Sequence, residues 1–281
     1  IKDLDSLPFP AWDLLDGFPH NYHPALFKYK RLPSAYIISS RGCPNTCIFC
    51  DTSVFSRRIR FHSPEYILEL VDCLIKKFNI KEIIFEDDQF LLKKKRVEKI
   101  CKGILRSKWN ISWSCSGRVN SVDDIGLLNL MKLSGCWQIN YGIESGNQYV
   151  LNHVIGKRIL LEKVLEVIAI FKKLKISSTG FFVIGLPGET KGNIRETINF
   201  MIKADFDHVL LSIATPYPGT DLYRICKEKK YIANQDISQL KPKFATISTN
   251  EFKREEVIKL RNDGLIRFQL NKMVKHPVKY A

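Results

Sequence analysis

The pattern that most limits the fold is a repeated alternation between a short apolar run and a longer amphipathic stretch. The short runs are mostly continuous rather than alternating, which is typical of strands covered on both faces of a parallel sheet. The repeat of roughly 30 to 40 residues fits a series of β/α units. The predicted strands cover residues 35–40, 81–87, 111–116, 137–144, 179–185 and 209–215, and the predicted helices 64–78, 93–107, 122–133, 160–174, 193–204 and 221–229.

Six β/α units predict an α/β fold, either a partial (β/α)6 TIM-type barrel or a doubly wound sheet. We expect the partial barrel as a core over residues 35–230. An N-terminal linker over 1–34 precedes it, and a C-terminal helical extension over 231–281 follows it, with helical spacing across 251–273. Both architectures gather ligands at the carboxyl ends of the strands, so the polar residues after each strand are the site candidates.

The loop after the first predicted strand, RGCPNTCIFC, places Cys43, Cys47 and Cys50 at a C-x3-C-x2-C spacing. Three thiolates can bind zinc, ligate an iron–sulfur cluster or carry out redox chemistry. A structural zinc site normally takes four protein ligands, and no fourth ligand lies near this loop. A four-iron cluster on three cysteines instead leaves one iron open, which predicts a reactive site. The lone cysteines are expected to be small buried hydrophobes: Cys73, Cys101, Cys115, Cys136 and Cys226.

CPNTCIFC, with an aromatic residue just before its third cysteine, resembles the cluster loop of the radical S-adenosylmethionine enzymes. The resemblance implies that Cys43, Cys47 and Cys50 hold a 4Fe–4S cluster and form the catalytic centre. It also implies that S-adenosylmethionine chelates the fourth iron. One electron from the cluster would then cleave the sulfonium to methionine and a 5′-deoxyadenosyl radical, which abstracts a substrate hydrogen.

Two strand ends carry the part of this resemblance that concerns the methionine moiety. EDDQF, residues 86–90, resembles the second-strand element that receives the methionine amino group, although the usual Gly-Gly-Glu is absent. Asp87 or Asp88 would take that role, because a carboxylate complements an ammonium. For the methionine carboxylate the resemblance implies Lys157, with Arg118 as a second candidate.

The fourth and fifth strands carry the part that concerns the nucleoside. GIES resembles the element whose Glu144, next to Ser145, binds the ribose hydroxyls or the methionine moiety. VIGLPGE resembles the motif whose backbone near Ile184 contacts adenine, with Phe49 against the ring. Tyr141, Phe182 and Tyr217 are possible lining residues without an assigned role.

Simpler interpretations exist for several of these residues. Asp87 and Asp88 could cap the following helix. Lys157 could be a solvated surface lysine, and GLPGE could be an ordinary turn.

The segments DLDSLPFPAWDLLD, GIESGNQYVL and TPYPGTDLY together resemble radical enzymes that follow an N-terminal cobalamin-binding domain. This implies methyl transfer, cyclisation or oxidoreduction of a small-molecule or lipid-like organic substrate. It also implies an electron donor such as flavodoxin or ferredoxin, and cobalamin bound by a domain that is not in this chain. No D-x-H-x-x-G element occurs, and the start at Ile1 in a Pro-rich stretch favours a chain cut at the linker.

Two other functions compete with this prediction. The formal charge of +15 suggests a radical methylthiotransferase acting on RNA, but such charge also fits a solvated Lys-rich surface. The densest basic run, residues 93–96, opens an amphipathic helix, and nucleic acid is not expected. A non-catalytic metal-binding module is the other alternative. No apolar run reaches the roughly 20 residues of a membrane span, and no signal peptide is visible, so the expected location is cytoplasmic.

Overall fold

The computed structural model describes residues 1–51, 55–121, 124–232, 240–241 and 244–277. The chain divides into two compact units. Unit 1 comprises Ile1–Pro44, Phe55–Tyr141 and Ala169–Ser178, and unit 2 comprises Asn45–Val54, Gly142–Ile168 and Thr179–Ala281. The predicted boundaries near residues 34 and 230 stay predictions.

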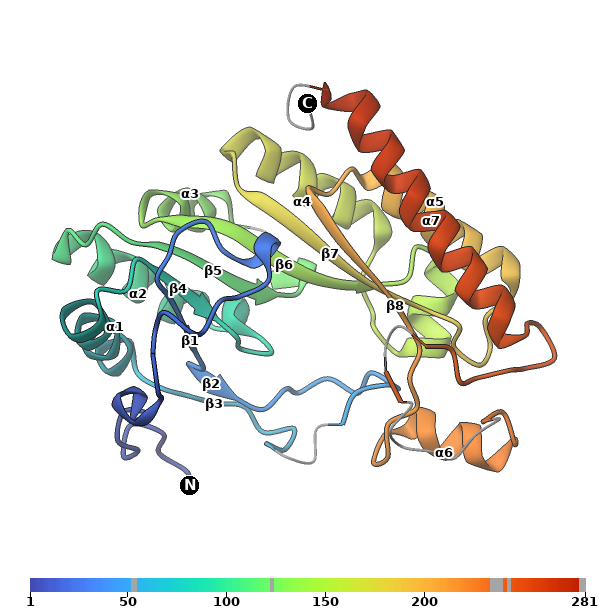
Figure 1. Ribbon diagram of the computed structural model, residues 1–281, viewed down its shortest axis with the longest axis horizontal. Coiled ribbons are helices and arrows are strands. Elements are labelled where there is room, and N and C mark those ends of the chain that lie inside the picture. Colours follow the sequence, from blue (N-terminus) through green and yellow to red (C-terminus); the bar gives the residue numbers. More distant parts are fainter. Residues whose placement is uncertain (52–54, 122–123, 233–239, 242–243, 278–281) are drawn as a thin grey trace. The chain divides into compact units, whose positions relative to one another are not determined.

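One six-stranded sheet has the order β1-β4-β5-β6-β7-β8. The registered pairs β1·β4, β4·β5, β5·β6 and β7·β8 are all parallel (Figure 1). This arrangement confirms the α/β class expected from the alternating pattern. The strands are β1 (Ser34–Ile37), β4 (Glu82–Phe85), β5 (Ser112–Gly117), β6 (Cys136–Glu144), β7 (Ser177–Ile184) and β8 (His208–Ile213).

A two-stranded antiparallel ribbon flanks the cysteine loop and was not predicted. It joins β2 (Ser40–Arg41) to β3 (Arg60–Phe61), with Ser40 opposite Phe61 and Arg41 opposite Arg60. The residues just before the loop are therefore part of regular structure.

Every predicted helix is present: α1 has the predicted ends, and the others differ from the prediction by one to a few residues at one end. The predicted start of the third helix at Val122 lies outside the described residues. The ends follow local chemistry: Ser63 accepts a hydrogen bond from the backbone N–H of Tyr66 at 3.0 Å before α1, and Asn79 ends α1 in the left-handed conformation. The α-helices are α1 (Pro64–Phe78), α2 (Lys94–Ser107), α3 (Ile125–Leu133), α4 (Leu161–Leu174), α5 (Lys191–Ala204), α6 (Asp221–Glu228) and α7 (Arg254–Lys275). Shorter turns of helix are η1 (Trp12–Leu14), η2 (Leu26–Lys28), η3 (Phe90–Leu92), η4 (Val119–Ser121) and the π-helix η5 (Val150–Ile155).

The core of unit 1 contains a cluster of three fully buried aromatic rings. Phe85 lies 4.4 Å from Phe90 and 5.7 Å from Trp113 between ring centroids. Such contacts bury a large apolar area and prefer tilted or edge-to-face geometry. They fix the carboxyl end of β4, the position from which the acidic pair Asp87 and Asp88 extends.

In unit 2, α5 and α7 lie side by side and run in the same direction (Figure 1). An ion pair of 2.9 Å joins Lys191 to Glu256 near their first turns, and another of 2.9 Å joins Lys272 to Asp205 beyond the end of α5. Gly264 brings the helices close, because a Cβ there would lie 2.9 Å from Cγ1 of Ile198. Of the helices that the structure describes, none combines the length and apolar character needed to cross a bilayer.

Candidate cofactor-binding site

The three clustered cysteines differ from most of the others in access to solvent. Cys43 and Cys47 are half-buried, while Cys50 is exposed. Four of the lone cysteines are buried, as expected: Cys101, Cys115, Cys136 and Cys226. Burial raises the pKa of Cys101 to about 12 and that of Cys226 to about 11, so both remain protonated thiols. Cys73 on α1 is half-buried, which is a partial departure from the expectation.

The second half of the cysteine loop is anchored within unit 2 by backbone hydrogen bonds. The N–H of Cys50 donates to the carbonyl of Cys47 at 3.0 Å, which closes a tight turn around a half-buried Phe49. The N–H of Ile48 donates to the carbonyl of Ile155 in η5 at 3.2 Å, and the carbonyl of Ile48 accepts from the N–H of Leu222 at 2.9 Å. The backbone of this part of the loop is thus held in place.

The donor set of the loop fits an iron–sulfur cluster by its chemistry. Fe–S clusters are ligated by cysteine thiolates, and Cys43, Cys47 and Cys50 are reachable thiols within eight residues of one another. Among the residues that the structure describes, no three Cys, His, Asp or Glu side chains already converge as metal ligands do.

The two acidic residues after β4 have different environments. Asp87 is buried, and its carboxylate accepts four hydrogen bonds from the backbone N–H and hydroxyl groups of Ser39 and Ser40. Burial raises the pKa of Asp87, whereas these hydrogen bonds and the charge of Arg96 lower it. Asp88 is exposed, and partial desolvation raises its pKa. Neither residue caps a helix: the N-cap positions of η3 and α2 are Gln89 and Lys93, and neither helix has a side-chain cap, so that interpretation is wrong.

Arg96 is a buried residue beside Asp87 that the sequence analysis did not single out. It belongs to the basic run 93–96, which was predicted to open an amphipathic helix, and it lies on the buried face of α2. Its guanidinium donates to the carbonyl of Ser39 at 2.9 Å and to that of His62 at 2.8 Å. The helical spacing of Arg96 with Ile100 and Ile104, both buried, could have predicted this orientation.

At the end of β6 the structure brings together Glu144 and Lys157. Their side chains form a buried ion pair with 2.8 Å between Nζ and Oε1, so the interpretation of Lys157 as a solvated lysine is wrong. Glu144 has a φ of 76°, which is uncommon for a residue with a side chain and is often found at functional sites. Gly142 provides the space for this pair: a Cβ there would collide with Oε1 of Glu144 and lie 2.6 Å from Nζ of Lys157.

The remaining polar candidates from the third and fourth strands lie in separate environments. Ser145 is buried and its hydroxyl lies 3.0 Å from that of Thr197 on α5, which also accepts from the N–H of Gly146 at 3.0 Å. Ser145 thus connects the end of β6 to α5 within unit 2. Arg118 is half-buried directly after β5 in unit 1.

The motif after β7 contains a second missed residue, Glu189. It is fully buried, and its carboxylate accepts a hydrogen bond from the N–H of Leu186 at 2.8 Å and one from the N–H of Gly185. The other carboxylate oxygen has no hydrogen-bond partner among the described residues. Burial raises the pKa of Glu189 to about 7. An acidic residue directly after a turn motif is the only signal in the sequence, and it does not distinguish a buried side chain from an exposed one.

Ile184, the predicted adenine contact, is the last residue of β7 and is fully buried. Its carbonyl accepts a hydrogen bond from the N–H of Ala214 at 2.8 Å. Two of the possible lining residues belong to the core instead: Tyr141 and Phe182 are fully buried, and Phe182 packs edge-to-face against Phe206. Tyr217 is exposed.

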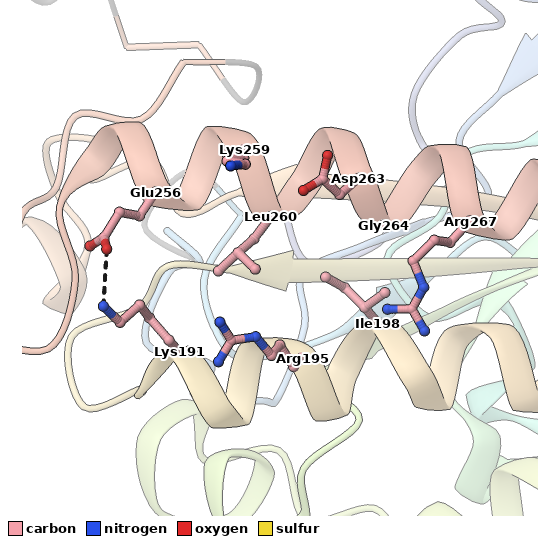
Figure 2. Close-up of a pocket in the computed structure, with 9 residues that line it drawn as sticks. All are labelled: Lys191, Arg195, Ile198, Glu256, Lys259, Leu260, Asp263, Gly264 and Arg267. Carbon is pink, nitrogen blue, oxygen red and sulfur yellow. Dashed lines mark hydrogen bonds and ion pairs between the residues drawn. The ribbon is translucent and has the colours of Figure 1, made fainter.

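A charged groove of about 520 Å³ lies between α5 and α7, and its lining contains none of the predicted site residues (Figure 2). It is lined by Lys191, Arg195, Ile198, Glu256, Lys259, Leu260, Asp263, Gly264 and Arg267. The ion pair between Lys191 and Glu256 spans it at one end (Figure 2). Its mixed charges and lack of thiols distinguish it from the candidate cofactor site.

Comparison with known proteins identifies the family. The model of the Radical SAM superfamily matches residues 37–201, which contain all three clustered cysteines and the ends of β4 to β7. Membership of this superfamily implies a 4Fe–4S cluster and S-adenosylmethionine as cofactors, in agreement with the predicted cofactors.

Two curated relatives are methyl-transfer and cyclase enzymes by name. An uncharacterized methyltransferase of Pyrococcus horikoshii is 34% identical over 277 residues, which cover 98% of this chain and 58% of that protein. An anaerobic magnesium-protoporphyrin IX monomethyl ester cyclase of Rubrivivax gelatinosus is 26% identical over 230 residues, covering 82% of this chain and 40% of that protein. The chain therefore spans less than two thirds of each of these relatives.

A solved structure of similar fold is the radical S-adenosylmethionine methyltransferase TsrM from Kitasatospora setae, with cobalamin and a 4Fe–4S cluster bound. It is 16% identical, has a TM-score of 0.62, and the match covers 72% of this chain and 41% of that one. This likeness in fold agrees with the predicted partial TIM-type barrel. The matched family and the accessible C-x3-C-x2-C thiols lead to one conclusion: the chain belongs to the radical SAM superfamily.

Proposed function

We propose that this chain is the radical-generating core of an enzyme for methyl transfer, cyclisation or oxidoreduction of a small-molecule or lipid-like organic substrate. When bound, the cluster supplies the electron that cleaves S-adenosylmethionine to methionine and a 5′-deoxyadenosyl radical. The observation that carries the proposal is the family match across residues 37–201, in which three accessible cysteines occupy one loop. Methyl transfer is favoured among the outcomes, because the relative that covers 98% of the chain is a methyltransferase by name.

Cys43, Cys47 and Cys50 would hold three irons of the cluster through their thiolates. In unit 1, Asp88 is the better of the two acidic residues for the methionine ammonium, because Asp87 already accepts four hydrogen bonds. Arg118, half-buried after β5, would complement the methionine carboxylate.

In unit 2, the ion pair between Glu144 and Lys157 would serve the polar part of S-adenosylmethionine, with the glutamate toward ribose hydroxyls or the methionine moiety. Ser145 would hold the end of β6 in place through Thr197. Ile184 and Phe49 would provide apolar surface for adenine, an assignment that suits a purine and does not require the bonded carbonyl of Ile184.

The test is anaerobic reconstitution with iron and sulfide, followed by dithionite and S-adenosylmethionine. We expect an electron paramagnetic resonance signal that S-adenosylmethionine perturbs, and 5′-deoxyadenosine detected by chromatography. Bound zinc with neither cluster nor cleavage would support the non-catalytic metal-binding module instead.

A matched pair of cysteine variants makes this test specific. Cys47→Ala should lose the cluster signal and the cleavage, whereas Cys73→Ala removes a half-buried thiol outside the loop and should keep both. If Cys47→Ala retained iron and cleavage, the ligand assignment would be wrong.

A radical methylthiotransferase acting on RNA is the second candidate. A putative methylthiotransferase of Methanocaldococcus jannaschii is 29% identical over 204 residues, and the chain carries a formal charge of +15. Affinity for RNA that falls steeply with salt would favour it. Absence of such binding alongside cleavage of S-adenosylmethionine would favour the small-molecule substrate.

The proposed chemistry needs further components. An electron donor such as flavodoxin or ferredoxin would reduce the cluster. Cobalamin, if used, would be bound by a domain outside this chain. A cluster that receives its electrons from such a donor fits a cytoplasmic location.

A further inference from the structure

Asp87 ties the end of β4 to the segment that leads into the cysteine loop, entirely within unit 1. Its Oδ1 accepts hydrogen bonds from the N–H of Ser39 at 2.8 Å, from the N–H of Ser40, and from the hydroxyl of Ser40 at 2.7 Å. Its Oδ2 accepts from the hydroxyl of Ser39 at 2.7 Å. Both carboxylate oxygens are occupied, and the residue is 3% exposed.

The carbonyl of Ser39 accepts two further hydrogen bonds. Arg96 donates to it at 2.9 Å, and the N–H of His62 donates to it at 3.0 Å. Arg96 also interacts electrostatically with Asp87. The N–H, carbonyl and hydroxyl of Ser39 are thus all bonded to groups that are distant in the sequence.

The restraint continues to the residue before the first cysteine. Ser40 and Arg41 pair with β3 as the strand β2. Gly42 has a φ of 96°, and a Cβ there would lie 2.7 Å from the carbonyl oxygen of Arg58 and 2.8 Å from that of Ser56. A side chain has no room at Gly42, because the backbone there packs closely against these two carbonyl groups. Hydrogen bonds and strand pairing thus hold Ser39, Ser40 and Arg41, and the closely packed Gly42 joins them to Cys43.

We propose that Asp87 is a positioning residue: it fixes the arm Ser39–Gly42 and thereby places the thiol of Cys43 for cluster binding. The cluster part of this role rests on the proposed function. A direct contact between Asp87 and S-adenosylmethionine would require breaking hydrogen bonds to a buried carboxylate, which is unfavourable. The exposed Asp88 needs no such exchange.

The first experiment measures amide hydrogen exchange in the protein without a cluster. Asp87→Asn replaces one acceptor oxygen with an N–H₂ group that faces donors, so the amides of Ser39 and Ser40 should exchange at least about tenfold faster. Asp88→Asn makes the same chemical change at an exposed neighbour, and these two amides should keep their wild-type rates. Equal rates in wild type and a folded Asp87→Asn variant would overturn the proposal.

The second readout is iron bound per chain after reconstitution, together with alkylation of Cys43 relative to Cys73. Asp87→Asn should retain several-fold less iron and alkylate faster at Cys43, whereas Asp88→Asn should match wild type in both. Unchanged iron content and alkylation in Asp87→Asn would exclude a positioning role toward the cluster.

Two further points keep the test decisive. Should Asp87→Asn fail to fold, Ser40→Ala removes only one hydroxyl donor and should give a smaller change of the same sign in exchange and alkylation. Failure of the wild-type protein to bind iron would reject the proposed function, and amide exchange would still decide whether Asp87 holds the arm.

Discussion

Asp87 in unit 1 and Glu189 in unit 2 are both buried carboxylates that bind backbone N–H groups just after a strand. Asp87 receives four hydrogen bonds and has Arg96 nearby. Glu189 accepts hydrogen bonds from the N–H groups of Gly185 and Leu186, and its second oxygen has no partner among the described residues. Burial raises the pKa of both, but for Glu189 it raises the value to about 7.

The comparison shows that the pKa of a buried carboxylate depends on its partners as well as on burial. Desolvation penalises the ionised form at both positions, and only hydrogen bonds and an opposite charge offset it. Asp87 has both, and they offset part of the rise in its pKa that burial causes. Glu189 instead is expected to exchange a proton near neutral pH.

The largest effect should come from removing the cation that distinguishes the two regions. Arg96→Met removes the positive charge that lowers the pKa of Asp87, together with two hydrogen bonds to carbonyls. We expect the free energy of unfolding to fall by about 3 kcal/mol, since each hydrogen bond made by a charged group contributes about 1.5 kcal/mol or more, measured by denaturant titration near neutral pH. A loss under about 1 kcal/mol would mean that the serine donors alone stabilise the anion.

The second prediction concerns pH and Glu189. Its pKa in the folded protein is about 7, above the ordinary 4.5, so between these values the folded state binds more protons than the unfolded state. The free energy of unfolding therefore decreases as pH rises from 4.5 to 7, by an amount on the order of 3 kcal/mol. Above pH 7 this contribution should be constant.

Glu189→Gln isolates this contribution, because its neutral amide can still accept from the backbone N–H groups of the turn. The difference in unfolding free energy between wild type and variant should change across pH 4.5 to 7 and stay flat above it. A difference that does not vary with pH would show that Glu189 keeps an ordinary pKa.

The smallest effect should come from removing one donor to Asp87. Ser40→Ala deletes a hydroxyl whose hydrogen bond is 2.7 Å long and leaves three other donors. We expect a loss of about 1 kcal/mol in unfolding free energy, seen as a shift of the denaturation midpoint without a change of slope. A loss as large as that of Arg96→Met would mean that the hydroxyl, and not the cation, keeps Asp87 charged.

The regular elements could be predicted because their signals are local. The helix over residues 64–78 was predicted to the residue, since Ser63 and Pro64 mark its start and Asn79 its end. The ribbon of β2 and β3 could not be predicted, because strands of two residues have no periodicity to detect. The helix of the tail was expected from residue 251 but begins at Arg254.

The site was predictable where chemistry is concentrated in one segment, as in the cysteine loop. The different roles of Asp87 and Asp88 were not, because adjacent residues of the same type differ only through partners 47 or 48 residues away in the sequence. The pairing of Lys157 with Glu144 likewise depends on the turn at η5 and on the space above Gly142. Such contacts arise from the tertiary fold and leave no local pattern.

The ion pair between Lys272 and Asp205 changes how the end of α7 should respond to proteolysis. Here Lys272 is 3% exposed, and trimming past it would leave the carboxylate at the end of α5 without this buried partner. The last turns of α7 are therefore a structural requirement of α5, and a protease that reaches them would damage the interior of unit 2 as well as its periphery.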